Sequence, residues 1–237
     1  MSEAVRTENA EEGVVRIVLD DGKANALSPA LLDALNRELD RAEKDASAVV
    51  LVGREGRFCA GFDLSVMRGG ADAARSLVGS GAELCMRLFE FPKPVVAAVT
   101  GHALAAGILV VAVCDYRVGA RGSFKLGLNE VAIGMTLPHF GREIARERLS
   151  KRHFDRAVVH AELYAPDAAV DAGYLDVAVE PDAVVATATE HALRLSKLDP
   201  GAFAHTKRAL HADAIARIRE RLQRDLGEAL PRRPDAS

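Results

Sequence analysis

Residues 94–107 read Pro-Val-Val-Ala-Ala-Val-Thr-Gly-His-Ala-Leu-Ala-Ala-Gly. Residues 95–99 form a short, continuous apolar run, which is typical of a β-strand buried on both faces. The chain then continues through small residues between Gly101 and Gly107, which predicts a tight loop that leads into a helix. In a parallel sheet such loops lie at the carboxyl ends of the strands, where ligands bind.

The same pattern occurs upstream. The apolar run 48–52 predicts a second buried strand, and residues 57–64, Arg-Phe-Cys-Ala-Gly-Phe-Asp-Leu, follow it as a second loop. Residues 14–19 predict a further strand, Ser28 predicts the N-cap of a helix, and another helix is expected at about 71–91. Strands separated by helices pair in parallel through right-handed crossovers, so the sequence predicts an α/β fold.

The second half of the chain is expected to be mostly helical. Short strands are predicted at 116–118, 124–126 and 175–179, and helices at about 150–160, 166–173, 181–198 and 201–226. Ser150 is expected to cap the first of these helices. In the last helix Ile215, Ile218 and Leu222 recur at helical spacing, so we expect this apolar stripe to pack against a neighbouring subunit.

The composition limits the class of protein. The chain has 237 residues, 49% of them apolar, which suits one large α/β domain or a domain with an appendage. Its 31 Lys and Arg residues nearly balance its 34 Asp and Glu residues, which argues against a broad basic surface for nucleic acid. The three cysteines form no Cys-x-x-Cys pair and the seven histidines are scattered, so we expect neither a disulfide framework nor a metal site.

The apolar segments are too interrupted for a membrane protein. The longest, 95–113, is broken by His102 and by two glycines, and residues 1–9 carry charges without an apolar run. We therefore expect no membrane span, no secretory signal and a cytoplasmic protein.

Signatures of several enzyme classes are missing from the sequence. It contains no Gly-x-Ser-x-Gly elbow, no Walker loop, no His-Glu-x-x-His motif and no Gly-x-Gly-x-x-Gly motif between a strand and a helix. What remains is the pair of loops after the two buried strands, which side by side could aim two free N–H groups at one oxygen. Such an oxyanion hole serves reactions that pass through an enolate or a tetrahedral alkoxide. In the alternative interpretation, the glycines form tight turns without any ligand.

Taken together, segments spread over most of the chain resemble the crotonase superfamily, the enoyl-CoA hydratase/isomerase group. They are Lys-Ala-Asn-Ala-Leu (23–27), Phe-Cys-Ala-Gly-Phe-Asp-Leu (58–64), Lys-Pro-Val-Val-Ala (93–97), residues 101–107, Cys-Asp-Tyr-Arg (114–117) and Gly-Leu-Asn-Glu (127–130). The resemblance implies an α/β, ClpP/crotonase-type spiral of β-β-α units in residues 1–180. It also implies a C-terminal helical region in residues 181–237 that builds homotrimers or hexamers.

The resemblance implies a site as well. The backbone N–H groups of Phe62 and Ala106 are expected to bind the carbonyl of an acyl-CoA thioester, provided that alanine at 106 adopts the backbone conformation required there. Glu130 is expected to act as the acid/base. The other substrate-binding candidates are Lys23, Ala24, Ala26, Ala60, Asp63 and Leu64 at the coenzyme A, and Leu109, Thr136, Leu137 and Pro138 at the acyl end. Neither a metal nor a cofactor other than the substrate's own coenzyme A is expected.

Leu109 departs from the hydratases of this family, which have a glutamate at its position in addition to the one at 130. Hydration must position a water and protonate C2, which leucine cannot support, whereas moving a double bond needs one base and a dry wall. We therefore expect an isomerase that moves the double bond of an enoyl-CoA from C3–C4 to C2–C3. Two alternatives remain open: a hydratase that uses Glu130 alone, and a non-catalytic acyl-CoA-binding protein. From the residues alone, Glu130 could also be a loop carboxylate paired with Lys125.

Overall fold

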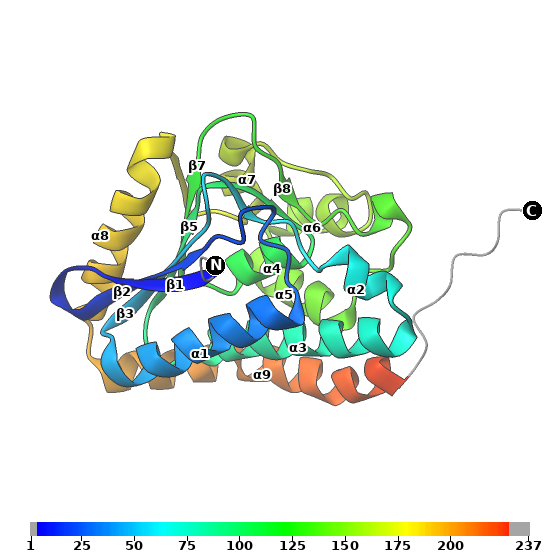
Figure 1. The fold of residues 1–237 in the computed structure, drawn as a ribbon, viewed down its shortest axis with the longest axis horizontal. Coiled ribbons are helices and arrows are strands. Elements are labelled where there is room, and N and C mark those ends of the chain that lie inside the picture. Colours follow the sequence, from blue (N-terminus) through cyan, green and yellow to red (C-terminus); the bar gives the residue numbers. More distant parts are fainter. Residues whose placement is uncertain (1–3, 228–237) are drawn as a thin grey trace, which may run out of the picture.

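The structure, a computed structural model, describes residues 4–227 and contains two β-sheets packed among helices (Figure 1). The larger sheet has the strand order β1 (Val5–Asn9), β2 (Val14–Leu19), β3 (Ala48–Val52), β5 (Val95–Val99), β7 (Tyr116–Ala120) and β9 (Val177–Val179). β1 pairs with β2 in antiparallel fashion, and the other neighbours are parallel. The parallel pairing predicted for the strands at 14–19, 48–52 and 95–99 is therefore confirmed.

The smaller sheet consists of β4 (Gly56–Cys59), β6 (Gly101–Leu104) and β8 (Leu126–Gly127), which are all parallel. Most of the residues of β4 and β6 belong to the segments 57–64 and 101–107, which we predicted as loops, so this part of the prediction is wrong. Strands of four residues carry too little apolar alternation to be seen in the sequence. They form because each pairs with a strand far away in the chain.

Strands of the two sheets alternate along the chain, and this alternation produces a spiral. β3 is followed by β4, β5 by β6, and β7 by β8, and after each pair the chain passes through one or more helices before it returns to the larger sheet. Each turn is thus a β-β-α unit, and the predicted spiral fold is confirmed.

The helices cover both faces of the larger sheet. They are α1 (Pro29–Asp45), α2 (Leu64–Arg68), α3 (Ala71–Glu90), α4 (Ala106–Ala112), α5 (His139–Arg148), α6 (Lys151–Val158), α7 (Pro166–Ala172), α8 (Val184–Ser196) and α9 (Pro200–Gly227). Single 3-10 turns occur at η1 (Glu11–Gly13), η2 (Val131–Ile133) and η3 (Pro181–Ala183). Ser28 caps α1 as predicted, because its Oγ accepts a hydrogen bond from the Leu31 N–H at 3.2 Å. Ser150 precedes α6 but makes no such bond, so its predicted capping is wrong.

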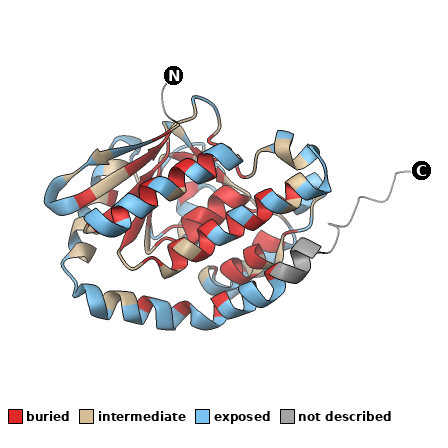
Figure 2. Ribbon diagram, turned by 60° about the horizontal axis from the view of Figure 1, so that its bottom comes forward, coloured by how far each residue is buried: buried red, intermediate tan, exposed pale blue. Residues whose placement is uncertain are grey.

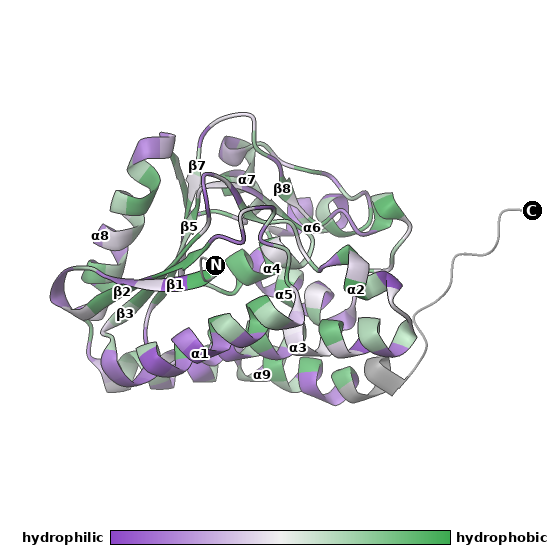
Figure 3. Cartoon of the chain, in the orientation of Figure 1, coloured by the Kyte–Doolittle hydropathy of each residue, from purple (hydrophilic) through white to green (hydrophobic). Residues whose placement is uncertain are grey.

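Both faces of the larger sheet are buried, which explains why its strands read as continuous apolar runs. In β3, Val49 and Leu51 belong to the main core with α1 and α3, whereas Val50 and Val52 pack in a second core with α8. Figure 3 shows β2 and β3 as apolar strands, with hydrophilic residues along α1. Between residues 4 and 227, no helix combines the length and the apolar character needed to cross a membrane.

The long helix α9 packs against other helices of the same chain. It lies along α3 and α5 (Figure 1), and Ile215, Ile218 and Leu222 are 2%, 1% and 8% exposed. The expectation that this stripe meets a neighbouring subunit is therefore wrong, because α3 and α5 already offer it an apolar surface. Figure 2 shows that the other side of the helix is exposed.

Candidate active site

A small cavity lies where successive turns of the spiral meet. It encloses about 30 Å³ between α2, α3, the start of α4, the segment after β8 and the start of α5. Its lining residues are Phe62, Met67, Val78, Ala106, Leu109, Glu130, Met135, Thr136, Pro138 and Phe140. Of the predicted site residues, the cavity brings together Phe62, Ala106, Leu109, Glu130, Thr136 and Pro138.

Glu130 is the one carboxylate that lines this cavity within the described part of the chain. It lies between β8 and η2, is 7% exposed, and its Oε2 atom has no hydrogen-bond partner. Burial raises the pKa of Glu130 to about 7, against a smaller opposite effect of the nearby backbone N–H groups. No cation contributes to this shift, so the alternative in which Glu130 pairs with Lys125 is wrong.

The backbone at Phe62 and the backbone at Ala106 lie next to each other. Gly61 has φ +92°, and a Cβ atom added to it would lie 2.8 Å from Ala105 Cβ and 3.3 Å from Ala106 N. Among the backbone hydrogen bonds of residues 4–227, neither the Phe62 N–H nor the Ala106 N–H donates to a carbonyl. Both donors are therefore available to a ligand. For Ala106 the reason is that it begins α4, and the first N–H groups of a helix have no acceptor inside it.

The unusual backbone conformation falls on Ala105 rather than on Ala106. Ala106 is the first residue of α4, whereas Ala105 precedes the helix with φ +50° and ψ −129°, a region that glycine favours. The prediction that position 106 needs a special backbone conformation is wrong by one residue, because the positive φ falls on Ala105. Ala105 lies at the turn from β6 into α4, directly before Ala106, which lines the cavity.

The side of the cavity around Leu109 is apolar. Leu109 and Phe140 are each 2% exposed, and Val78 is 7% exposed. No charged group other than Glu130 lines the cavity within the described residues. A carboxylate in such surroundings keeps its proton to a higher pH than it would in water, in agreement with the direction of its pKa shift.

The residues predicted for coenzyme A lie outside this cavity, on an edge beside it. The Ala60 N–H donates to the Ala24 carbonyl at 3.1 Å, and Leu27 and Phe62 form a parallel bridge. The segments 23–27 and 60–64 are thus neighbours, with Lys23 exposed at their edge.

Two residues of this edge, Asp63 and Asn25, also stabilise the local structure through hydrogen bonds. The Asp63 carboxylate caps α2, accepting hydrogen bonds from Ser65 N at 2.8 Å and Ser65 Oγ at 2.6 Å, and these bonds lower its pKa. Asn25 is fully buried, and its Nδ2 donates to the carbonyls of Leu19 at 2.8 Å and Phe58 at 3.1 Å. Asn25 therefore fixes the 23–27 segment between β2 and β4.

Four further residues line the cavity that the sequence did not predict: Met67, Val78, Met135 and Phe140. Their signal was weak, because each of them looks like an ordinary core residue in its segment. Leu137, which was predicted, does not line the cavity but lies buried behind it.

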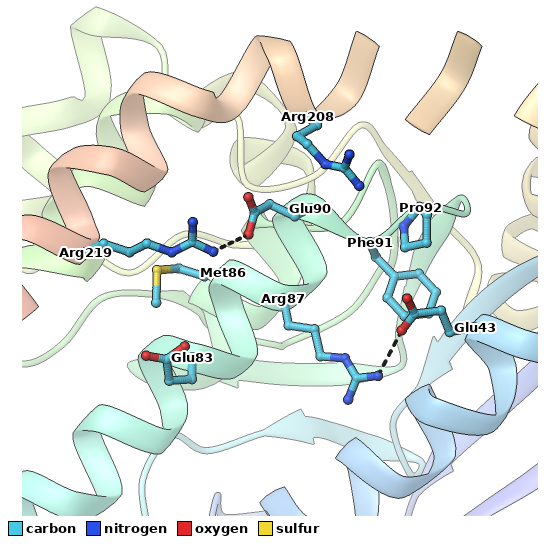
Figure 4. Close-up of a pocket in the computed structure, with 9 residues that line it drawn as sticks. All are labelled: Glu43, Glu83, Met86, Arg87, Glu90, Phe91, Pro92, Arg208 and Arg219. Carbon is cyan, nitrogen blue, oxygen red and sulfur yellow. Dashed lines mark hydrogen bonds and ion pairs between the residues drawn. The ribbon is translucent and has the colours of Figure 1, made fainter. Parts of the chain in front are cut away.

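A larger hollow of about 270 Å³ lies on the far side of α3, between α1 and α9. Figure 4 shows that charged side chains surround it, and that they pair with one another: Arg219 with Glu90, and Arg87 with Glu43. These groups tie three helices together. Across residues 4–227, no group of three or more His, Cys, Asp and Glu side chains is placed to hold a metal ion.

Comparison with known proteins agrees with this fold. The family model for enoyl-CoA hydratase/isomerase matches residues 9–228. The chain therefore belongs to the enoyl-CoA hydratase/isomerase family.

Its relatives carry two kinds of name. Enoyl-CoA delta isomerase 1 of human mitochondria is 31% identical over 76% of this chain, which spans 61% of that protein. The 2,3-dehydroadipyl-CoA hydratase of Escherichia coli is also 31% identical, over 78% of this chain and 73% of its own length. The crystal structure of an enoyl-CoA hydratase/isomerase family protein from Pseudomonas syringae has a TM-score of 0.93 and 38% identity, and covers 97% of this chain and 99% of its own.

Proposed function

We propose that the protein moves the double bond of an enoyl-CoA of fatty-acid metabolism from C3–C4 to C2–C3. The observation that carries this proposal is the single buried carboxylate, Glu130, in a cavity whose other walls are apolar. A base with a pKa near 7 can take up a proton and release it again at neutral pH. Isomerisation needs both steps from the same group.

The proton moves in two steps. Ionised Glu130 removes a proton from C2, and the negative charge that develops on the thioester oxygen is bound by the N–H groups of Phe62 and Ala106. Protonated Glu130 then delivers the same proton to C4 while the double bond forms between C2 and C3. One C–H bond breaks and one forms, so no water or co-reactant is consumed.

Leu109 supports isomerisation over hydration. A hydratase must hold a water molecule beside the double bond, and the hydrogen bonds for that water would have to come from the position that the buried leucine occupies. The apolar wall also keeps water away from the enolate.

The proposed substrate brings its own coenzyme A, and no separate cofactor is involved. We expect the main chain of segments 23–27 and 60–64 to hold the adenine and the pantetheine. Lys23 would be near the phosphates, because it is a cation exposed at this edge.

The test is turnover of 3-hexenoyl-CoA, followed by the ultraviolet absorbance of the conjugated 2-enoyl product. We expect Glu130→Gln to lower kcat at least about 100-fold, because the amide can neither take nor return the proton. Glu83→Gln is the matched control, since Glu83 is exposed on the far side of α3 (Figure 4). Equal turnover by the wild type and Glu130→Gln would contradict the proposal and, if acyl-CoA still binds, would favour a non-catalytic binding protein.

A second measurement separates isomerase from hydratase. The wild type and Leu109→Glu are both given 2-hexenoyl-CoA, and loss of the conjugated thioester is followed. We expect the wild type to hydrate this substrate poorly and Leu109→Glu to hydrate it faster. If the wild type already hydrates as fast as the variant, Glu130 alone supports hydration and the isomerase proposal is wrong.

A further inference from the structure

The cavity beside Glu130 is small enough to limit the length of the acyl chain. Its volume of about 30 Å³ is room for two or three groups the size of a water molecule or a methylene, by the usual measure of roughly 10–15 Å³ of such space per water. If the thioester carbonyl sits at the N–H groups of Phe62 and Ala106, the carbons that react already fill this space. The inference below rests on the proposed function.

Phe62 forms one wall of the cavity. A Cβ atom added to Gly81 of α3 would lie 2.4 Å from Cε1 and 2.5 Å from Cζ of this ring. The ring is therefore seated directly on the backbone of α3, and an acyl chain cannot pass between them. A methyl group at position 81, as in Gly81→Ala, would displace the ring.

Packing between α4 and α5 forms another wall, to which Leu109 and Phe140 belong. A Cβ atom added to Gly141 would lie 2.9 Å from Leu137 Cδ1 and 3.1 Å from Leu109 Cδ1. Phe140, Leu109 and Leu137 are 2–3% exposed. Beyond them lies the close-packed main core, so the cavity has no extension in this direction.

Two methionine side chains also line the cavity. Met67 lies on the short helix α2 and Met135 follows η2, and both are half-buried. Methionine side chains are unbranched and adapt their shape to fill gaps. Shortening these two side chains would enlarge the cavity for a longer chain.

We infer that the site favours short acyl chains and that Met67 and Met135 set this limit. The backbone walls at Phe62 and Gly141 are fixed by close packing, whereas the methionine side chains can be shortened without touching the N–H groups or Glu130. Chain length is therefore a property of these two side chains.

The test compares kcat/KM for 3-hexenoyl-CoA and 3-dodecenoyl-CoA. We expect the wild type to favour the shorter substrate at least tenfold, and the double variant Met67→Ala/Met135→Ala to reduce that preference at least fivefold. Val66→Ala is the matched control, because Val66 is half-buried on the same helix but does not line the cavity. Equal rates on both substrates in the wild type, or an unchanged ratio in the double variant, would overturn the inference.

Binding separates this inference from the proposed function. Hexanoyl-CoA and dodecanoyl-CoA are saturated, so calorimetry measures how the cavity accepts each chain without any turnover. We expect hexanoyl-CoA to bind at least as tightly as dodecanoyl-CoA, although the longer chain has more apolar surface to bury. A protein that fails to isomerise but shows this order would contradict only the proposed function. Tighter binding of dodecanoyl-CoA would overturn the chain-length limit, whatever the enzyme catalyses.

Discussion

Ala105 carries backbone strain directly beside the N–H group of Ala106. Its φ of +50° with ψ of −129° is a conformation that an L-residue adopts only at a cost, and glycine adopts it freely. Strain of this kind persists where the surroundings impose it, and here the Ala105 methyl packs against Gly61 of the neighbouring segment. The same contact explains why position 61 accepts no side chain.

Ala105→Gly is expected to stabilise the protein by about 1 kcal/mol, because relief of strain outweighs the greater freedom of glycine in the unfolded chain. Urea unfolding followed by circular dichroism measures this change. Ala186→Gly on the exposed face of α8 is the control, and there the same substitution should destabilise by about 1 kcal/mol. If both variants lose stability alike, position 105 is not strained.

As the proposed base, Glu130 is expected to determine how activity depends on pH. Burial raises its pKa to about 7, and the base must be ionised to take the C2 proton. We expect kcat/KM to rise about tenfold per pH unit below pH 7 and to level off above it. Leu109→Asn, which places a polar group in the dry wall, should move the midpoint to lower pH. A profile that is flat between about pH 5.5 and 8 would show that Glu130 is not the base.

At the scale of elements, a buried ion pair ties α9 to the rest of the fold. Lys207 Nζ lies 2.7 Å from Asp115 Oδ2, and the Lys207 side chain is 4% exposed. The same carboxylate oxygen accepts a hydrogen bond from the Val95 N–H at 2.8 Å. Burial lowers the pKa of Lys207, whereas Asp115 acts in the opposite direction. The pair thus fixes the start of β5 to a helix that follows about a hundred residues later.

Lys207→Met is expected to cost about 3 kcal/mol of stability, because it leaves the Asp115 carboxylate buried without its cation. The double variant Lys207→Met/Asp115→Asn should lose less, since the asparagine is neutral and still accepts the Val95 N–H bond. Chemical unfolding of the two single variants and the double variant gives the coupling energy directly. Additive losses would mean that the two groups act independently.

The elements that sequence patterns predict well are those with many apolar residues. Sequence patterns predict β3 and β5 from their continuous apolar runs. They predict α1 from its N-cap and its apolar stripe, because the pattern extends over the whole helix. β1 and β4 are different. Val5–Asn9 and Gly56–Cys59 are mostly polar or short, and what makes them strands is the partner that pairs with them. Such pairing depends on the complete fold and is invisible in a local window.

The candidate site divides in the same way. Glu130, Leu109 and the two N–H donors were predicted because they stand in motifs with a fixed spacing. Met67 and Met135 were not, because which side chains close a cavity depends on how α2 and the segment after η2 lie over it. Likewise, the sequence does not show which surface covers the apolar stripe of α9. In the fold, α3 and α5 of the same chain cover it.

At the scale of the whole molecule, the helical region after residue 180 completes the subunit. α8 covers one face of the larger sheet and α9 covers α3 and α5. The domain boundary at 180/181 and the assembly into trimers or hexamers stay predictions. If such an assembly forms, its contacts must use surfaces other than the buried stripe, such as those around Leu198 and Leu210, which are 51% and 70% exposed.

The three groups proposed to act on the substrate come from three successive turns of the spiral. Phe62 follows β4, Ala106 follows β6, and Glu130 follows β8. In the proposed mechanism, Phe62 and Ala106 act through backbone N–H groups, which most side-chain substitutions leave in place. Glu130 acts through its side chain. Point mutations can therefore replace the catalytic side chain after β8, while the backbone N–H groups after β4 and β6 still bind the thioester. A scaffold of this kind lets descendants of one ancestral gene acquire new reactions without first losing their substrate.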